Sequence, residues 1–205
     1  MQSNPLRAQH SSKPTSRGVH HLALNTSDMK ATTEFYHGVL GMPLVHALRV
    51  PPGVGVGPGN RGNPPFENLR HYFFDAGGDT LLAFFELPAE EVAVGDRNTI
   101  ASMQHVSFTT TKTQFDAMKA RLLDHGISFL GPVCVGVETW SIYIFDPNGI
   151  RLEYSYQEDD PDDLQGVHVV QRWTQTKSEI SEELQTLDVD PQWLDAMTQH
   201  LPAQR

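Results

Sequence analysis

The chain has 205 residues and a net charge of −10, and its 39% hydrophobic and 20% charged residues are typical of a folded globular protein. No apolar run approaches the roughly 20 residues that span a bilayer, and the Lys and Arg residues form no cluster, so neither a membrane nor a nucleic acid is an expected partner. The single cysteine, Cys134, excludes an intramolecular disulfide and favours a reducing, cytoplasmic setting. A small molecule is therefore the expected partner.

The first half of the chain begins after a polar, aperiodic segment. We predict a flexible arm over residues 1–17 and a first module over residues 18–95. His21–Asn25 reads as a strand, and the helix that follows is capped by Ser27 or Asp28 and ends at Gly41. Three further apolar stretches then favour strands over residues 43–50, 71–74 and 81–87.

The second half repeats this order over residues 96–156. His105–Thr109 reads as a strand, and Thr113–His125 reads as a helix that ends at Gly126. Strands are then expected around residues 127–130, 136–140, 141–145 and 150–156. The recurrence of strand, helix and strands in both halves predicts an internal duplication.

Two segments depart from the repeat. Ten of the fifteen residues over 51–65 are Gly or Pro, which excludes a central strand or helix and predicts a long loop, either over a site or remote from one. Residues 157–205 read as an acidic linker followed by helical stretches, Ser178–Leu187 and Gln192–Leu201, the second with Pro191 at its start. The tail carries no pattern typical of catalysis.

A histidine opens each module and a glutamate stands near its end. His21 and His105 each share a strand face with small residues, and Glu86 and Glu153 each lie in a strongly apolar strand. A buried carboxylate is unfavourable unless a cation or several donors neutralise it. Taken singly, such a histidine is usually a hydrogen-bonded core residue, and Glu86 could simply leave the sheet before Pro88. Their repetition favours a site of two histidines and two glutamates for one divalent Fe, Mn, Ni, Co or Zn.

Three segments resemble the vicinal oxygen chelate superfamily, which contains glyoxalases, bleomycin-resistance proteins and extradiol dioxygenases. They are His21-Leu-Ala-Leu with Glu34-Phe-Tyr-His-Gly-Val-Leu-Gly41, then His105-Val-Ser-Phe, and Phe145-Asp-Pro-Asn-Gly-Ile-Arg-Leu-Glu153. The resemblance covers about residues 18–156 and implies an α+β fold of two tandem βαβββ modules forming a curved mixed sheet around a metal. It also implies metal ligands at His21, Glu86, His105 and Glu153. His20 points to the opposite face from His21 and is the less favoured ligand.

The resemblance leaves three functions open. Four protein ligands imply a glyoxalase-like lyase or isomerase in which Glu86 or Glu153 acts as base. An extradiol dioxygenase, which uses two His and one Glu and needs three open positions, is the alternative. Tyr143 favours it by resembling that family's tyrosine, but the histidine that precedes this tyrosine in the family is missing from residues 134–138. A tyrosine that donates near the metal ligands and one that only packs across the sheet are equally consistent with the sequence. The third possibility is a metal-free binding or resistance protein. A homodimer formed through open sheet edges is also expected.

Overall fold

The computed structural model describes residues 16–53, 67–88, 96–100, 102–136, 138–158 and 169–203. Most of the predicted flexible arm, most of the Gly/Pro-rich loop and most of the acidic linker therefore lie outside the described residues. The chain divides into two compact units, residues 18–167 and residues 1–17 with 168–205. None of the described helices is both long and apolar enough to cross a membrane.

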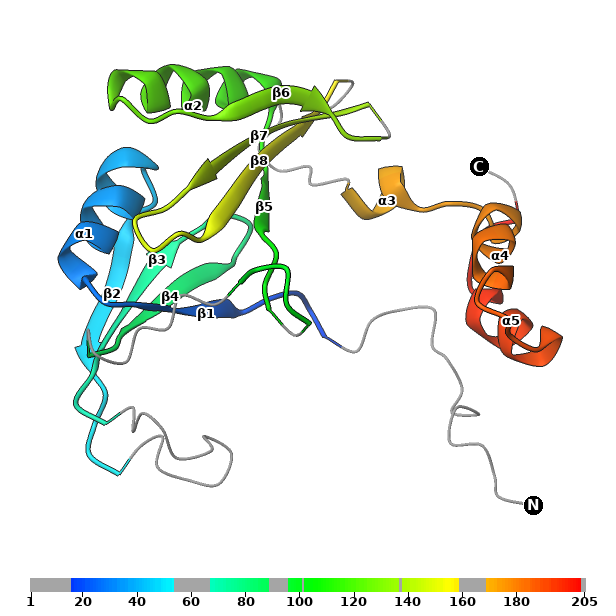
Figure 1. Ribbon diagram of the computed structural model, residues 1–205, viewed down its shortest axis with the longest axis horizontal. Helices are drawn as coiled ribbons and strands as arrows, with labels where there is room; N and C mark the ends of the chain where they lie inside the picture. The colour runs from blue at the N-terminus through cyan, green and yellow to red at the C-terminus, as the bar shows by residue number, and fades with distance from the viewer. Residues whose placement is uncertain are drawn as a thin grey trace. The chain divides into compact units, whose positions relative to one another are not determined.

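The first module forms one mixed four-stranded sheet, sheet A, in the order β1-β4-β3-β2 (Figure 1). Its elements are β1 (His21–Thr26), α1 (Met29–Thr33), the π-helical turn η2 (Glu34–Val39), β2 (Leu44–Arg49), β3 (Arg70–Asp75) and β4 (Leu81–Glu86). Strand β1 pairs with β4 in parallel, whereas β3 is antiparallel to both β4 and β2. The Asp28 side chain caps α1 by accepting from the Ala31 amide, and Gly41 takes φ 74° where the helix ends.

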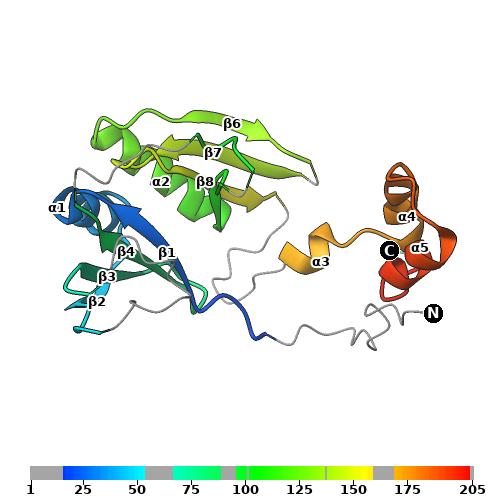
Figure 2. The same cartoon turned by 60° about the horizontal axis from the view of Figure 1, so that its bottom comes forward.

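The second module repeats this topology in sheet B, in the order β5-β8-β7-β6 (Figure 1). Figure 2 shows β8, β7 and β6 of this sheet from another side. Its elements are β5 (Val106–Thr109), α2 (Lys112–Asp124), β6 (Leu130–Cys134), β7 (Thr139–Phe145) and β8 (Arg151–Gln157). Thr111 and Gln114 form a reciprocal capping box at the start of α2. The duplication into two βαβββ modules, predicted from the repeat, is confirmed. Within the described residues, however, the strands form two separate sheets and not one continuous curved sheet.

One core cluster contains residues from both modules. Each helix packs on one face of its sheet: the Tyr36 ring lies 4.8 Å from that of Phe84, and the Phe115 ring lies 4.8 Å from that of Tyr156. The most buried members are Tyr36, Phe74, Leu82, Phe84, Phe115, Leu122, Ile142, Ile144 and Leu152. These apolar side chains alternate along the strands, so each sheet has a core-facing side, which we call its helix face, and an opposite side.

The two modules are joined by polar contacts at the turn between β7 and β8. The Tyr36 hydroxyl donates to Asp146 Oδ2 over 3.1 Å, and the Thr26 hydroxyl donates to Asn148 Oδ1 over 2.7 Å. Asp146 is buried and accepts three more bonds, from the Asn148 amide, the Ile150 amide and the Asn148 side chain. The turn residues that resemble the family's closing motif therefore also hold the first module to the second.

The bounds of the two strands between α2 and β8 were predicted less well from the sequence. It predicted separate strands over 127–130 and 136–140, whereas β6 spans Leu130–Cys134 and β7 begins at Thr139. The cause is a tight turn: the Thr139 amide donates to Gly136 O, with Gly136 at φ 63°. In the C-terminal unit, α4 (Lys177–Gln185) and α5 (Pro191–Thr198) match the predicted helices, and α3 (Val169–Trp173) was not predicted.

Candidate functional site

The register of sheet A places His21 on the side opposite the helix. His21 pairs with Leu81 and Ala23 with Ala83, and Phe73 of β3 pairs with Ala83 in turn. Because side chains alternate along strands, these residues share the face that α1 does not cover. We call it the ring face, since it carries His21, His46, His71, Phe73 and Phe85.

The matching side of sheet B carries hydroxyl groups and a carboxylate. Tyr143 pairs with Glu153, and Ser141 pairs with Ser155, whereas Leu152 and Tyr154 alternate onto the helix face. We call this side the hydroxyl face. Tyr143 and Glu153, both predicted site residues, are therefore neighbours across two paired strands, and His105 stands immediately before β5 on the other side of Glu153.

The Glu153 carboxylate is held at both oxygens. Its Oε1 accepts from the Tyr143 hydroxyl at 2.9 Å and from the Ser155 hydroxyl at 3.1 Å, while Oε2 lies 2.9 Å from His105 Nε2. Ser155 in turn contacts the hydroxyls of Ser141 and Ser107. Glu153 is only 6% exposed, so this fixed geometry belongs to a largely desolvated carboxylate.

Hydrogen bonds keep this carboxylate charged. Burial alone would raise the pKa of Glu153, but hydrogen bonds from Ser141, Tyr143 and Ser155 outweigh it and lower the pKa below its usual value. Burial, followed by the hydrogen bond to Glu153, raises the pKa of Tyr143. At neutral pH the tyrosine therefore keeps its proton and donates it towards an ionised glutamate.

The position of His105 fits a cation ligand. Its Nδ1 is hydrogen-bonded to the side-chain oxygen of Gln104, which assigns the proton of a neutral ring to Nδ1. The lone pair of His105 Nε2 would then point at a lone pair of Glu153 Oε2. Because two lone pairs repel each other, a proton or a metal ion must lie between these two atoms. A histidine whose second nitrogen donates to an oxygen is also the usual arrangement of a metal ligand. His105 and Glu153 thus fit two positions of a divalent ion.

The other two predicted ligands do not join this pair. His21 lies on the ring face, with its Nδ1 2.9 Å from Nδ1 of His20 and its ring 6.0 Å from that of Phe73. Within the described ranges, no three His, Cys, Asp or Glu side chains gather closely enough to hold a metal. The described donors therefore make half of the expected site and do not close a full one.

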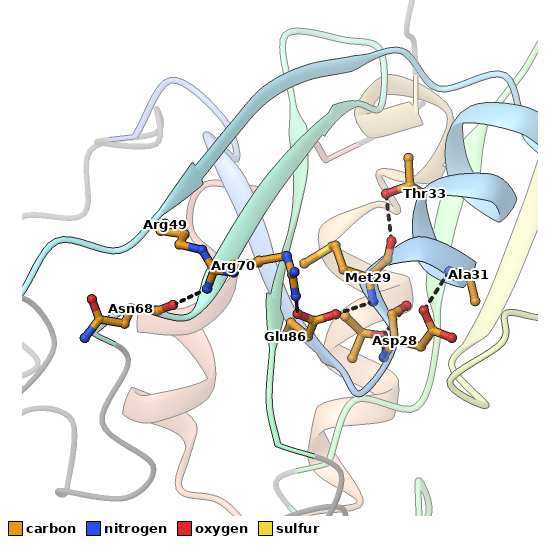
Figure 3. A network of polar contacts seen from close by, with 9 residues as sticks. Asp28, Met29, Ala31, Thr33, Arg49, Asn68, Arg70 and Glu86 are labelled. Atoms are coloured by element: carbon orange, nitrogen blue, oxygen red, sulfur yellow. Dashed lines mark hydrogen bonds and ion pairs between the residues drawn. The ribbon is translucent and has the colours of Figure 1, made fainter.

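Glu86 lies on the helix face of sheet A. It pairs with Thr26, an odd number of residues from His21, so the two side chains point to opposite sides. Glu86 Oε1 accepts from the Met29 amide at 2.9 Å, and Oε2 forms an ion pair with Arg70 (Figure 3). A cavity of about 360 Å³ adjoins this network. The assignment of Glu86 to the ligand set, made from the repeat and from the resemblance, is not supported by this position, because its carboxylate is neutralised by Arg70.

We expect Glu86→Gln to lower the free energy of unfolding by about 1 kcal/mol, because it weakens a charge-assisted bond to the first turn of α1 and a partly exposed ion pair. The metal content should not change. Chemical denaturation and elemental analysis of the same preparation measure the two effects. Loss of metal without loss of stability would return Glu86 to the ligand set.

Internal symmetry identifies the residue that stands where the second module has its glutamate. The turns Ala76–Thr80 and Asp146–Ile150 are closed by the same backbone bond, from the first amide to the last carbonyl. The third residue after each turn is Ala83 in the first module and Glu153 in the second. Ala83 pairs with Ala23, two residues after His21, and Glu153 pairs with Ser107, two residues after His105. The place that is equivalent to Glu153 is therefore occupied by alanine in the first module.

The comparisons with known proteins agree with this architecture. The model of the Glyoxalase/Bleomycin resistance protein/Dioxygenase superfamily matches residues 18–154. A glyoxalase/dioxygenase from Nostoc punctiforme is 26% identical, with a TM-score of 0.51 over 70% of this chain and 92% of its own. A glyoxylase/bleomycin resistance protein/dioxygenase domain from Frankia sp. EAN1pec is 19% identical, with a TM-score of 0.55 over 70% and 100%.

A putative dioxygenase from Bacillus subtilis shares the fold at 23% identity and a TM-score of 0.50, over 69% of this chain and 41% of its own. The family match spans both modules and ends one residue after Glu153. The chain belongs to the Glyoxalase/Bleomycin resistance protein/Dioxygenase superfamily.

Proposed function

We propose that this protein is a metal-dependent enzyme that acts on a small substrate with two vicinal oxygens, and that His105, Glu153 and His21 would hold the ion. The observation that carries the proposal is the 2.9 Å approach of His105 Nε2 to Glu153 Oε2, with the remaining polar atom on each side already engaged. His21 does not approach the other two donors in this structure, and it is included because it opens the first module as His105 opens the second.

When bound, the ion would supply positive charge that holds and acidifies vicinal oxygens of the substrate. The chain's own residues have separate tasks. Gln104 fixes the ring of His105, and Tyr143 and Ser155 occupy Glu153 Oε1, so that only Oε2 is presented. The Tyr143 hydroxyl, protonated at neutral pH, would serve as a proton donor to a substrate oxygen if it exchanged its bond to Glu153 Oε1 for one to the substrate.

Among the reaction classes, the donor count favours a ring-cleaving dioxygenase over a glyoxalase-like lyase. Ala83 occupies the place equivalent to Glu153 and Glu86 points to the other side of the sheet, so at most three of the predicted donors remain within the described residues. An octahedral ion would then keep three positions for two substrate oxygens and O2. The contact of Tyr143 with Glu153 also supports this class, because it brings the tyrosine against a proposed metal ligand. In a metal-free binder, a proton would have to lie between His105 Nε2 and Glu153 Oε2.

The test is elemental analysis of protein purified without chelators, followed by oxygen-electrode assays with catechol. We expect about one Fe or Mn per chain and O2 uptake that stops when the metal is removed. Stoichiometric Ni or Zn with isomerisation of a hemithioacetal and no O2 uptake would establish the lyase instead. Absence of metal after reconstitution would leave the binding protein.

A further inference from the structure

The cavity of about 360 Å³ beside Glu86 lies on the helix face of sheet A, on the side of the sheet that His21 does not occupy. Helix α1 and the start of η2 form one wall of this cavity, and strands β3 and β4 form the other (Figure 3). Charged side chains of both signs line it: Asp28, Lys30 and Glu34 on the helix wall, and Arg70 and Glu86 on the strand wall. The cavity therefore has the chemistry of a site for a charged ligand.

The strand wall presents a guanidinium group that is only partly engaged. Arg70 uses Nη1 for its ion pair with Glu86, and its side chain is still 42% exposed. Arg49 of β2 pairs with Arg70 in the register, so both side chains take the same side of the sheet (Figure 3). Like charges directly opposite each other on a sheet are unfavourable, and the ion pairs of the described residues give these two arginines one carboxylate, Glu86. An anionic group would find attraction and N–H donors here.

The helix wall presents carboxylates that can accept further bonds. Asp28 Oδ1 accepts from the Ala31 amide at 2.9 Å, and Glu34 Oε1 lies 2.5 Å from Lys30 Nζ. The second oxygen of each carboxylate also has the capacity to accept. This wall thus sets two carboxylates against one ammonium, and an additional cationic group would complement it. Between the two walls, the partly buried ring of Tyr72 and the methyl group of Thr33 provide apolar surface.

We propose that this cavity binds a small zwitterionic α-amino acid. Its carboxylate would contact Arg70, its ammonium would contact Asp28 and Glu34, and its side chain would pack against Tyr72. Both charges of such a ligand meet the wall of opposite excess charge, which neither an acid nor an amine alone can do. The site goes beyond the proposed function, because it lies on the other side of sheet A from His21 and uses neither the metal nor the substrate.

The lining disfavours simpler ligands. A metal ion is disfavoured because, within the described residues, the carboxylates do not gather closely enough to hold one. A multiply charged anion such as phosphate would meet the carboxylates of Asp28, Glu34 and Glu86 as well as Arg70. A diamine would meet the charges of Lys30 and Arg70. Like charges within a binding site are unfavourable in each case, and a zwitterion avoids both conflicts.

The test is equilibrium dialysis of the full chain against radiolabelled L-leucine, with two competitors that each lack one charged group. The first, 4-methylpentanoate, is leucine without its ammonium, and the second, 3-methylbutan-1-amine, is leucine without its carboxylate. We expect each competitor to bind at least about tenfold more weakly than L-leucine, because each loses a charge-assisted contact. The affinity for L-leucine should be the same before and after treatment with chelator, since no metal takes part in the contact.

Substitutions on each wall test the two contacts separately. Arg70→Gln should weaken L-leucine binding at least about tenfold, and Arg49→Gln, which leaves the ion pair of Arg70 with Glu86 intact, should weaken it about threefold. Circular dichroism confirms that both variants are folded. The effect of Arg49→Gln keeps the test decisive if Arg70→Gln does not fold.

On the helix wall, the double variant Asp28→Asn with Glu34→Gln removes both charges, while asparagine can still cap α1. It should weaken L-leucine binding roughly 3- to 10-fold. Asp116→Asn is the matched control, because Asp116 forms the same pair with a lysine four residues away, Lys112, on α2 and does not line the cavity. The control should have no effect.

Several results would overturn the inference. Competition by 4-methylpentanoate equal to that of L-leucine would mean an anion site, and equal competition by the amine would mean a cation site. Unchanged affinity in both arginine variants, or in the double variant of the helix wall, would place the bound amino acid elsewhere. Absence of binding by both L-leucine and L-alanine at about 10 mM would mean that the charges lining the cavity only neutralise one another.

Discussion

Replacing Glu153 with alanine is expected to reduce metal affinity and turnover by more than about 100-fold, beyond the range found when only an outer partner of a ligand is lost. The change removes one of the two donors that the structure brings together and leaves His105 Nε2 without its 2.9 Å partner. Tyr143→Phe, which removes one of the bonds to Oε1, should have the milder effect of an outer partner, roughly 10- to 100-fold.

Elemental analysis and steady-state rates measure both variants, and Glu86→Gln serves as the matched control because it alters a glutamate at the end of the other module. Circular dichroism confirms that each variant is folded. Full metal content in Glu153→Ala would show that the hydroxyl face does not hold the ion. A Tyr143→Phe variant with unaltered kinetics would reduce that tyrosine to a packing residue.

The largest expected loss of stability follows Asp146→Ala, at about 3 kcal/mol. Its carboxylate accepts four hydrogen bonds, from two backbone amides of its own turn, the Asn148 side chain and the Tyr36 hydroxyl of the first module. Removing it leaves buried donors unsatisfied, each unfavourable by about 1–3 kcal/mol, although such effects are not additive. Tyr36→Phe removes a single bond between the modules and should lower the stability by about 1 kcal/mol.

Urea denaturation at neutral pH provides both values. The pH dependence gives a further check. Burial raises the pKa of Asp146 above its ordinary value of 3.8, so the folded state takes up this proton more readily than the unfolded state. The stability that comes from this preferential proton uptake is fully present below the ordinary pKa of 3.8, and it is lost as the pH rises through the raised pKa of the folded state. Wild type should therefore gain stability over Asp146→Asn as the pH falls towards 4. A constant difference would contradict this assignment, and an Asp146→Ala variant as stable as wild type would exclude the turn as the junction of the modules.

The fold was predictable because its signals are local and repeated. Gly41 ends the first helix with a positive φ, and Thr111 begins the second with a capping box, as residues of these types do in many proteins. The repeated order of elements then required two similar modules. The contact of His105 with Glu153 followed from the same repeat. Strands β5 and β8 pair in parallel, and the residue that pairs with Glu153 is Ser107, two residues after His105.

The side of the sheet on which Glu86 lies could not be predicted from the sequence pattern. Residues 81–87 are apolar at nearly every position, so alternation along the strand could not show which side Glu86 takes. A usable signal was the turn: counting three residues from the ends of Ala76–Thr80 and Asp146–Ile150 reaches Ala83 and Glu153. The ring face could not be recognised for a related reason, since His46, His71 and Phe85 come from three strands whose register only the folded sheet defines.

The most direct test of the three-donor site is the metal content of His21→Ala measured beside that of Glu86→Ala, in full-length protein purified without chelators. We expect His21→Ala to lose most of its metal, whereas Glu86→Ala should keep the wild-type amount. Metal retained in His21→Ala and lost in Glu86→Ala would contradict it, and would mean that the helix face of sheet A, and not its ring face, completes the site.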